Sequence, residues 1–206
     1  ALPIAVKHKL TTPLARIYSS RADLAVKKGE MDNALSLHKK ALEMQIKLRD
    51  AQGAARSYNN MGYIFRRQRD NKRAIEVYGN VEELLESEDS PDLTEARIRL
   101  ASAFLEMGEM DRARDHAMKA HDETAENNQE KLHARSRAVL GRYYARIKDN
   151  DLAMHHYTGA LEILSDQSDP RSAVEVEILL GHIGLANKKL LRIIGTVQGS
   201  DEDKGI

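Results

Sequence analysis

Residues Gly53 to Leu85 read GAARSYNNMGYIFRRQRDNKRAIEVYGNVEELL, and this stretch decides the fold. Its first half spaces apolar residues three, four and seven positions apart, which gathers their side chains on one face of an α-helix. These residues are Tyr58, Met61, Gly62 and Phe65. The pattern predicts a helix that ends in the polar run after Phe65.

The second half repeats the pattern after a polar turn, with a stripe formed by Ala74, Tyr78, Val81 and Leu85. The turn contains Asp70 and Asn71, which suit turns and can cap the next helix by accepting a backbone N–H. The stretch therefore predicts a helical hairpin whose helices approach closely at small residues such as Gly62. By the same reasoning, Ser90 is expected to cap a later helix that begins at Pro91.

Small residues recur along the chain at intervals of 39 or 40 residues. In the first helix of each predicted hairpin they are Ala22, Gly62, Ala101, Gly141 and Gly181, and in the second helix Ala34, Ala74, Ala113 and Ala153. A stacked array requires such a period, because each hairpin buries its faces only against its neighbours. We therefore predict an all-α fold, a right-handed α-solenoid of four full repeats with a partial or capping fifth.

The predicted array covers residues 14–194, with repeats at 14–50, 53–87, 91–127, 130–166 and 171–194. Residues 1–13 are predicted to be a linker or the end of a preceding element, with Pro13 in the first turn of the first helix. Residues 195–206 are predicted to be a disordered acidic tail. Because the chain begins with Ala1 and not Met, we interpret it as a fragment or a processed form.

Composition narrows the classes of function. The chain has 32 basic and 32 acidic residues, so its net charge gives no attraction to nucleic acid or to an acidic membrane. The basic run from Arg66 to Arg73 spans a helix end, a turn and a helix start, so it presents no continuous face to a nucleic acid. The absence of cysteine excludes disulfides and thiol catalysis and agrees with a reducing compartment. We predict a cytoplasmic protein that does not span a membrane.

The histidines do not form a metal-binding or catalytic pattern. His155 and His156 are adjacent and point to different faces of a helix, while His116 and His121 are five positions apart, not the three or four that bring side chains together. The chain also lacks an H-E-x-x-H motif, a nucleophile elbow and a phosphate-binding glycine loop. The sequence predicts no metal site, no cofactor and no catalytic residue, so we do not expect an enzyme.

These repeats resemble the tetratricopeptide repeat family, which places aromatic residues, a Leu-Gly pair and small residues at set positions. The resemblance covers about residues 14–190. In the second repeat it rests on Tyr58, Met61, Gly62, Phe65, Ala74 and Tyr78, and in the fourth on Leu140, Gly141, Tyr144, Ala153, Tyr157 and Ala160. The usual period of this family is about 34 residues. The longer period here is similar to that of the repeats in cell-polarity scaffolds such as Partner of Inscuteable. The residues that lead into and form the first helix of the second repeat also resemble the sequence pattern of those repeats: Arg49, Asp50, Gly53, Ala55, Tyr58, Asn60, Met61 and Gly62.

The resemblance implies a concave groove, lined by the first helices, that holds a peptide or a helix from a partner. Its predicted residues face away from the packing stripes: Arg16, Ser19, Asp23, Arg56, Asn59, Tyr63, Arg66, Arg67, Arg99, Ser102, Arg135, Arg142, Arg146 and His182. The arginines predict an acidic or carboxylate-bearing peptide, with Tyr63 as the best apolar anchor. The chain is thus predicted to be a non-enzymatic scaffold or adaptor.

Two other functions stay open. The same surface suits a peptide-sensing regulatory domain of a larger signalling or transcriptional protein. The last repeat also has an apolar end without an obvious polar capping helix, which suits self-association into a homo-oligomer. Its residues are Ile178, Leu179, Ile183, Ile193, Ile194 and Val197.

Overall fold

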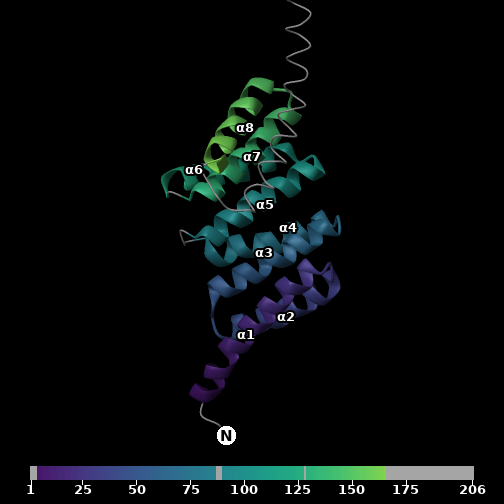
Figure 1. Ribbon diagram of the computed structural model, residues 1–206, viewed down its shortest axis with the longest axis vertical. Coiled ribbons are helices and arrows are strands. Elements are labelled where there is room, and N and C mark those ends of the chain that lie inside the picture. The colour runs from purple at the N-terminus through teal and green to yellow at the C-terminus, as the bar shows by residue number, and fades with distance from the viewer. Residues whose placement is uncertain (1–3, 87–89, 128, 166–206) are drawn as a thin grey trace, which may run out of the picture. The chain divides into compact units, whose positions relative to one another are not determined.

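The computed structural model describes residues 4–86, 90–127 and 129–165, and every regular element within them is an α-helix (Figure 1). The helices are α1 (Ile4–Lys27), α2 (Met31–Lys47), α3 (Ala51–Arg67), α4 (Asn71–Leu85), α5 (Pro91–Met107), α6 (Met110–Glu126), α7 (Glu130–Arg146) and α8 (Asn150–Ser165). The predicted all-α fold of consecutive hairpins is confirmed. The predicted repeat at 171–194 and the predicted tail at 195–206 lie outside the described residues.

The chain divides into two compact units, Ala1–Glu123 and Thr124–Ile206. In the first unit, α1 packs against α2, and α3 packs against α4, so each pair forms a hairpin. The hairpins also contact each other, because α2 packs against α3 and α4 packs against α5. In the second unit, α7 and α8 form a further hairpin around the buried Tyr157.

Five helices, α1, α2, α3, α5 and α7, end in the same kind of turn. One residue in each turn has a left-handed backbone, with φ between 55° and 80°: Gly29, Arg49, Arg69, Gly108 and Lys148. The next residue then donates its N–H to the carbonyl five positions earlier, as Asp70 does to Phe65 at 2.9 Å. This bond satisfies a helix-terminal carbonyl that would otherwise lack a partner. Glycine enters the left-handed region without strain, whereas arginine and lysine do so at a cost.

An acidic residue follows the left-handed residue in all five turns: Glu30, Asp50, Asp70, Glu109 and Asp149. The carboxylate of Asp50 accepts the N–H of Gly53 at 2.8 Å, and that of Asp70 accepts the N–H of Arg73 at 3.0 Å. Each of these side chains caps the next helix, which confirms the predicted capping at Asp70. The turn therefore closes one helix and opens the next within two residues.

One predicted helix start is confirmed and another is wrong. Ser90 caps α5, where its Oγ accepts the N–H of Asp92 at 3.3 Å, and Pro91 is the first helical residue. In contrast, α1 begins at Ile4, so Pro13 lies inside this helix and not in its first turn. The residues before Pro13 include several good helix formers, and they extend the helix even though proline removes one backbone donor.

Tyrosine rings fill the space beside the glycines of the first helices. A Cβ atom on Gly62 would lie 2.3 Å from Cε1 of Tyr78, and one on Gly141 would lie 2.7 Å from Cε1 of Tyr157. Tyr78 is fully buried. The sequence predicted that small residues permit close approach of two helices, and the structure shows that each glycine accommodates an aromatic ring from the second helix.

His38 is a fully buried titratable residue on α2. Neither ring nitrogen has a hydrogen-bond partner among the described residues, and Nε2 lies 3.7 Å from Oδ1 of Asp23. Burial lowers the pKa of His38 below its ordinary value of 6.5, although the charge of Asp23 acts to raise it. The imidazole is therefore uncharged in the folded protein at neutral pH.

We expect the free energy of unfolding to fall as the pH drops below 6.5, the ordinary pKa of histidine. Below that pH the unfolded chain binds a proton that the buried ring binds only at lower pH, so the contribution of His38 is complete above pH 6.5 and is lost in acid. Urea unfolding at several pH values will measure this slope. His38→Leu should flatten it, whereas His155→Gln, at an exposed site, should leave it unchanged. An unchanged slope in His38→Leu would contradict this assignment.

Candidate functional site

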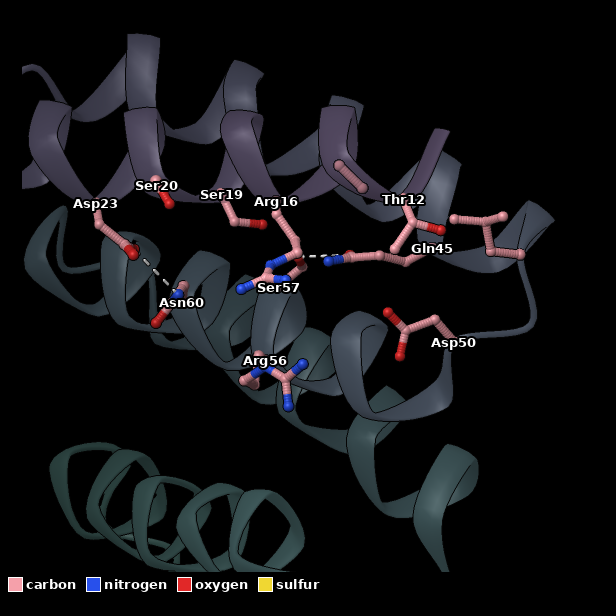
Figure 2. A pocket seen from close by; sticks show the side chains of 12 residues that line it. Thr12, Arg16, Ser19, Ser20, Asp23, Gln45, Asp50, Arg56, Ser57 and Asn60 are labelled. Carbon is pink, nitrogen blue, oxygen red and sulfur yellow. Dashed lines mark hydrogen bonds between the residues drawn. The ribbon is translucent and has the colours of Figure 1, made fainter. Parts of the chain in front are cut away.

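A cavity of about 470 Å³ lies in the first unit, between α1 and α3 and beside the C-terminal end of α2. Figure 2 shows side chains from α1 and α3 directed toward each other across it. The lining residues are Thr12, Ala15, Arg16, Ser19, Ser20, Asp23, Gln45, Leu48, Asp50, Arg56, Ser57 and Asn60. Because all but Ala15 and Leu48 are polar or charged, the cavity suits a ligand with hydrogen-bonding groups.

A buried hydrogen bond ties together the two helices beside the cavity. The hydroxyl of Ser57 on α3 donates to Oε1 of Gln45 on α2 at 2.7 Å, and both side chains are buried. A buried polar group without a partner costs about 1–3 kcal/mol, so each of these two residues fixes the position of the other. The bond thus holds this wall of the cavity in place.

The two carboxylates of the cavity already accept hydrogen bonds. Asp50 caps α3 through the N–H of Gly53. Asp23 accepts a hydrogen bond from Nδ2 of Asn60 at 3.4 Å, which joins α1 to α3 across the cavity (Figure 2). Part of the negative charge is therefore engaged in holding the walls together.

The two arginines of the cavity differ in their partners. Nη1 of Arg56 lies 3.4 Å from Oδ2 of Asp92, an ion pair in which the arginine side chain is largely exposed. Burial raises the pKa of Asp92, and the charge of Arg56 only partly opposes this, which marks a weak pair. Arg16 extends from α1 toward the cavity (Figure 2). It makes no hydrogen bond or ion pair with the described residues. Its guanidinium is thus available to a ligand.

The structure brings four of the predicted groove residues together in this cavity: Arg16, Ser19, Asp23 and Arg56. Arg16 and Arg56 are 40 residues apart and occupy equivalent positions in consecutive first helices. The position 39 residues after Arg56 is Glu95, so the positive charge at this position is not repeated in the third hairpin. The cavity is therefore a local site on the first two hairpins.

Two other predicted groove residues are buried between helices. Asn59 donates from Nδ2 to the backbone carbonyl of Asp92 at 2.8 Å, which ties α3 to α5. Ser102 donates to the carbonyl of Ile98 within α5 at 3.0 Å. In the structure, these side chains serve the packing and are turned away from solvent.

Three of the remaining predicted residues of the first unit, Tyr63, Arg66 and Arg99, take part in ion pairs or a cation–π contact on α3 and α5. Arg66 pairs with Glu106, and Arg99 pairs with Glu95. The guanidinium of Arg99 also lies 5.5 Å from the ring centre of Tyr63, while Arg67 is exposed. The second unit holds Arg135, Arg142 and Arg146 on α7, and His182 lies outside the described residues.

Sequence reasoning missed six polar residues of the cavity: Thr12, Ser20, Gln45, Asp50, Ser57 and Asn60. One signal was present for Asn60, which stands 40 residues after Ser20 and so occupies the same position in the next repeat. Nothing in the local pattern marked Gln45 or Ser57, because their role depends on each other across two helices.

The part of the chain that the structure describes contains neither a metal-binding cluster nor a membrane-spanning helix. No group of three or more histidine or acidic side chains there is arranged to hold a metal ion. Likewise, none of its helices combines the length and the hydropathy of a membrane span.

The comparisons with known proteins agree with this architecture. The family model of the tetratricopeptide repeat matches residues 13–87, which contain α2, α3, α4 and most of α1. Among solved structures, BtubC (BKLC) from P. vanneervenii is 20% identical, with a TM-score of 0.69 over 92% of this chain and 83% of that chain. No curated protein matches the chain by sequence.

Two more solved structures share the fold. The apo form of RapI is 17% identical, with a TM-score of 0.68 over 92% of this chain and 72% of that chain. A putative kinesin light chain with nearly identical TPR-like repeats, from Podospora anserina, is 16% identical, with a TM-score of 0.63 over 92% and 96% of the two chains. The fold is thus that of tetratricopeptide-type helical repeats.

Proposed function

We propose that this chain is a non-enzymatic adaptor whose α1–α3 cavity binds an acidic segment of a partner protein. The observation that carries the proposal is Arg16, a cation on the cavity wall without a partner among the described residues. Arg56 supports it, since its exposed pair with Asp92 is easily exchanged for a ligand carboxylate. The resemblance to Partner of Inscuteable-type repeats and a cytoplasmic location belong to the same proposal.

The neutral polar residues of the cavity suit a peptide ligand. An extended peptide presents backbone N–H and C=O groups along its length, and the hydroxyls of Thr12, Ser19 and Ser20 can both donate and accept hydrogen bonds. Arginine forms two parallel hydrogen bonds with a carboxylate, which fixes the orientation of an acidic side chain or a C-terminus. The cavity thus combines one charged anchor with polar contacts for a peptide backbone.

The test begins with affinity capture of a partner and mapping of its binding to a short acidic peptide. Arg16→Glu is expected to weaken that peptide about 10- to 100-fold, the effect of losing a charge-assisted hydrogen bond of about 1.5–3 kcal/mol. Lys39→Glu makes the same change of charge at an exposed site outside the cavity, so it should alter the affinity less than about twofold. Fluorescence anisotropy with the labelled peptide will measure both.

A salt series separates site binding from general attraction. The affinity of wild type should fall with rising salt, and that of Arg16→Glu should fall less, since the main charged contact is gone. Equal affinities for Arg16→Glu and Lys39→Glu would reject the cavity as the binding site. Loss of binding confined to Arg142→Glu would instead place the peptide on the second unit.

A further inference from the structure

The outward face of α1 carries an uncovered apolar stripe. Leu14, Ile17 and Leu24 are exposed by 39%, 52% and 52%. With Arg21, they follow each other at intervals of three, four and three residues, which places all four side chains along one side of the helix. The adjoining side of α1 is committed to the core through Ala22 and Ala25. We call the four residues Leu14, Ile17, Arg21 and Leu24 the α1 outer face.

The equivalent faces of the next two first helices are buried. Forty residues after the α1 outer face stand Ala54, Ser57, Met61 and Ile64, and 79 residues after it stand Leu93, Ala96, Leu100 and Ala103. All eight are buried. For example, Ile17 on α1 is 52% exposed, whereas its equivalents Ser57 on α3 and Ala96 on α5 are 1% and 0% exposed. The α1 outer face is therefore a packing face without a neighbour in the described residues.

The buried copies show what kind of neighbour this face takes. On α3 the face is covered by α2: Ile64 packs with Ala34 and Leu37, and Ser57 bonds to Gln45. These contacts run in opposite order along the two helices, so α2 lies antiparallel to α3. On α5, Leu93 and Ala96 pack in the same cluster as Val81 and Leu85 of α4. In both cases an amphipathic helix, the second helix of the preceding hairpin, covers the face together with residues of the preceding first helix.

The charge of the α1 outer face defines the neighbour further. Arg21 is exposed and has no partner among the described residues, whereas its equivalents are the apolar Met61 and Leu100. A carboxylate on a neighbouring helix would complement the charge of Arg21. A second copy of this chain, paired antiparallel on the same face, would oppose Arg21 with Ile17 and offer no acidic residue. Charge complementarity thus favours a different helix over self-pairing.

We propose that the α1 outer face binds an amphipathic helix of a partner protein, antiparallel to α1, with apolar residues on Leu14, Ile17 and Leu24 and a carboxylate on Arg21. This is the mode in which an amphipathic helix lays its apolar face on a complementary surface. The surface is separate from the α1–α3 cavity, and the inference does not depend on the proposed peptide site.

The probe is a pair of synthetic peptides of about 18 residues, or five helical turns, made of alanine, leucine, lysine and glutamate. Leucines repeat at spacings of three and four, and the position opposite Arg21 is glutamate in one peptide and lysine in the other. By fluorescence anisotropy, the glutamate peptide should bind wild type at least about tenfold more tightly than the lysine peptide. Arg21→Glu should reverse this preference.

Two lysine variants locate the binding surface. Ile17→Lys should weaken the glutamate peptide at least about tenfold. Ile46→Lys makes the same change at an isoleucine of α2 that is 56% exposed, and it should leave the affinity within about twofold of wild type. Both sites are exposed, so circular dichroism should show unchanged helicity. Equal binding by wild type and Ile17→Lys would overturn the proposal, as would a wild-type dimer in sedimentation velocity that Ile17→Lys converts to monomer.

Discussion

Replacement of Gly62 by alanine is expected to lower the free energy of unfolding by about 2 kcal/mol, although alanine is the better helix former by about 1 kcal/mol. The new Cβ would lie 2.3 Å from Cε1 of Tyr78. That ring is fully buried among other side chains, so it cannot turn away. Overpacking of this kind costs about 1–3 kcal/mol or more, which outweighs the gain in helix propensity.

Gly79 provides a matched control for this experiment. It lies within α4, and an added Cβ there would meet nothing within 4 Å. Gly79→Ala should therefore stabilise the chain by about 0.5–1 kcal/mol, because only the helix propensity changes. Urea unfolding will measure both variants. If the effect of Gly62→Ala arises from the Tyr78 ring, it should largely disappear in a Tyr78→Leu background, and a persistent loss there would contradict this cause.

Removal of the Arg97 guanidinium is expected to cost about 2–3 kcal/mol of unfolding free energy. Arg97 lies on α5 with its side chain 13% exposed, and it pairs with Glu82 of α4 and Glu123 of α6. Breaking a buried ion pair leaves uncompensated charge and costs about 3–5 kcal/mol, a value reduced here by the partial exposure of both glutamates. Arg97→Met keeps the packing of the side-chain stem and removes the charge.

Variants of the two glutamates can separate the effect of lost charge at Arg97 from the effect of lost packing. Glu123 also accepts a hydrogen bond from Oγ1 of Thr94 at 3.0 Å. Glu82 lies 3.4 Å from Nδ1 of His116, and although burial raises the pKa of Glu82, His116 and Arg97 lower it overall. Adding Glu82→Gln and Glu123→Gln to Arg97→Met should recover at least half of the loss, measured by urea unfolding at neutral pH. If the triple variant is as unstable as Arg97→Met, packing and not charge is the cause.

The helices and their turns were predictable because they rest on local and repeated patterns. Apolar residues such as Tyr58 and Tyr78 must recur at helical spacing for hairpins to stack, and this constraint is visible in a single sequence. The capping role of Asp70 was likewise predictable, since a short acidic side chain before a helix has few alternatives. The start of α1 was not, because Pro13 is compatible both with the first turn of a helix and with a helix that is already under way.

The candidate site was less predictable, because its residues act through partners that are distant in sequence. Asn59 is polar and lies off the apolar stripe, yet it is buried by a hydrogen bond to the carbonyl of Asp92 in the next hairpin. Arg66 is paired with Glu106, which is 40 residues away in the sequence, so this proximity depends on the fold. Arg16 and Arg56 could be assigned to one surface because they are one repeat apart, but the sequence did not reveal that their partners differ.

The uncovered face of α1 has a consequence for how the first unit opens. In an array held together by neighbour contacts, partial unfolding starts at the helix with the fewest neighbours. Among the described residues of this unit, α3 is packed by α2, α4 and α5, whereas the α1 outer face has no neighbour. The cavity therefore lies between a readily detached helix and a firmly held one. A ligand that bridges α1 and α3 binds only when α1 is in place. Its binding free energy therefore adds to the stability of α1 against local unfolding.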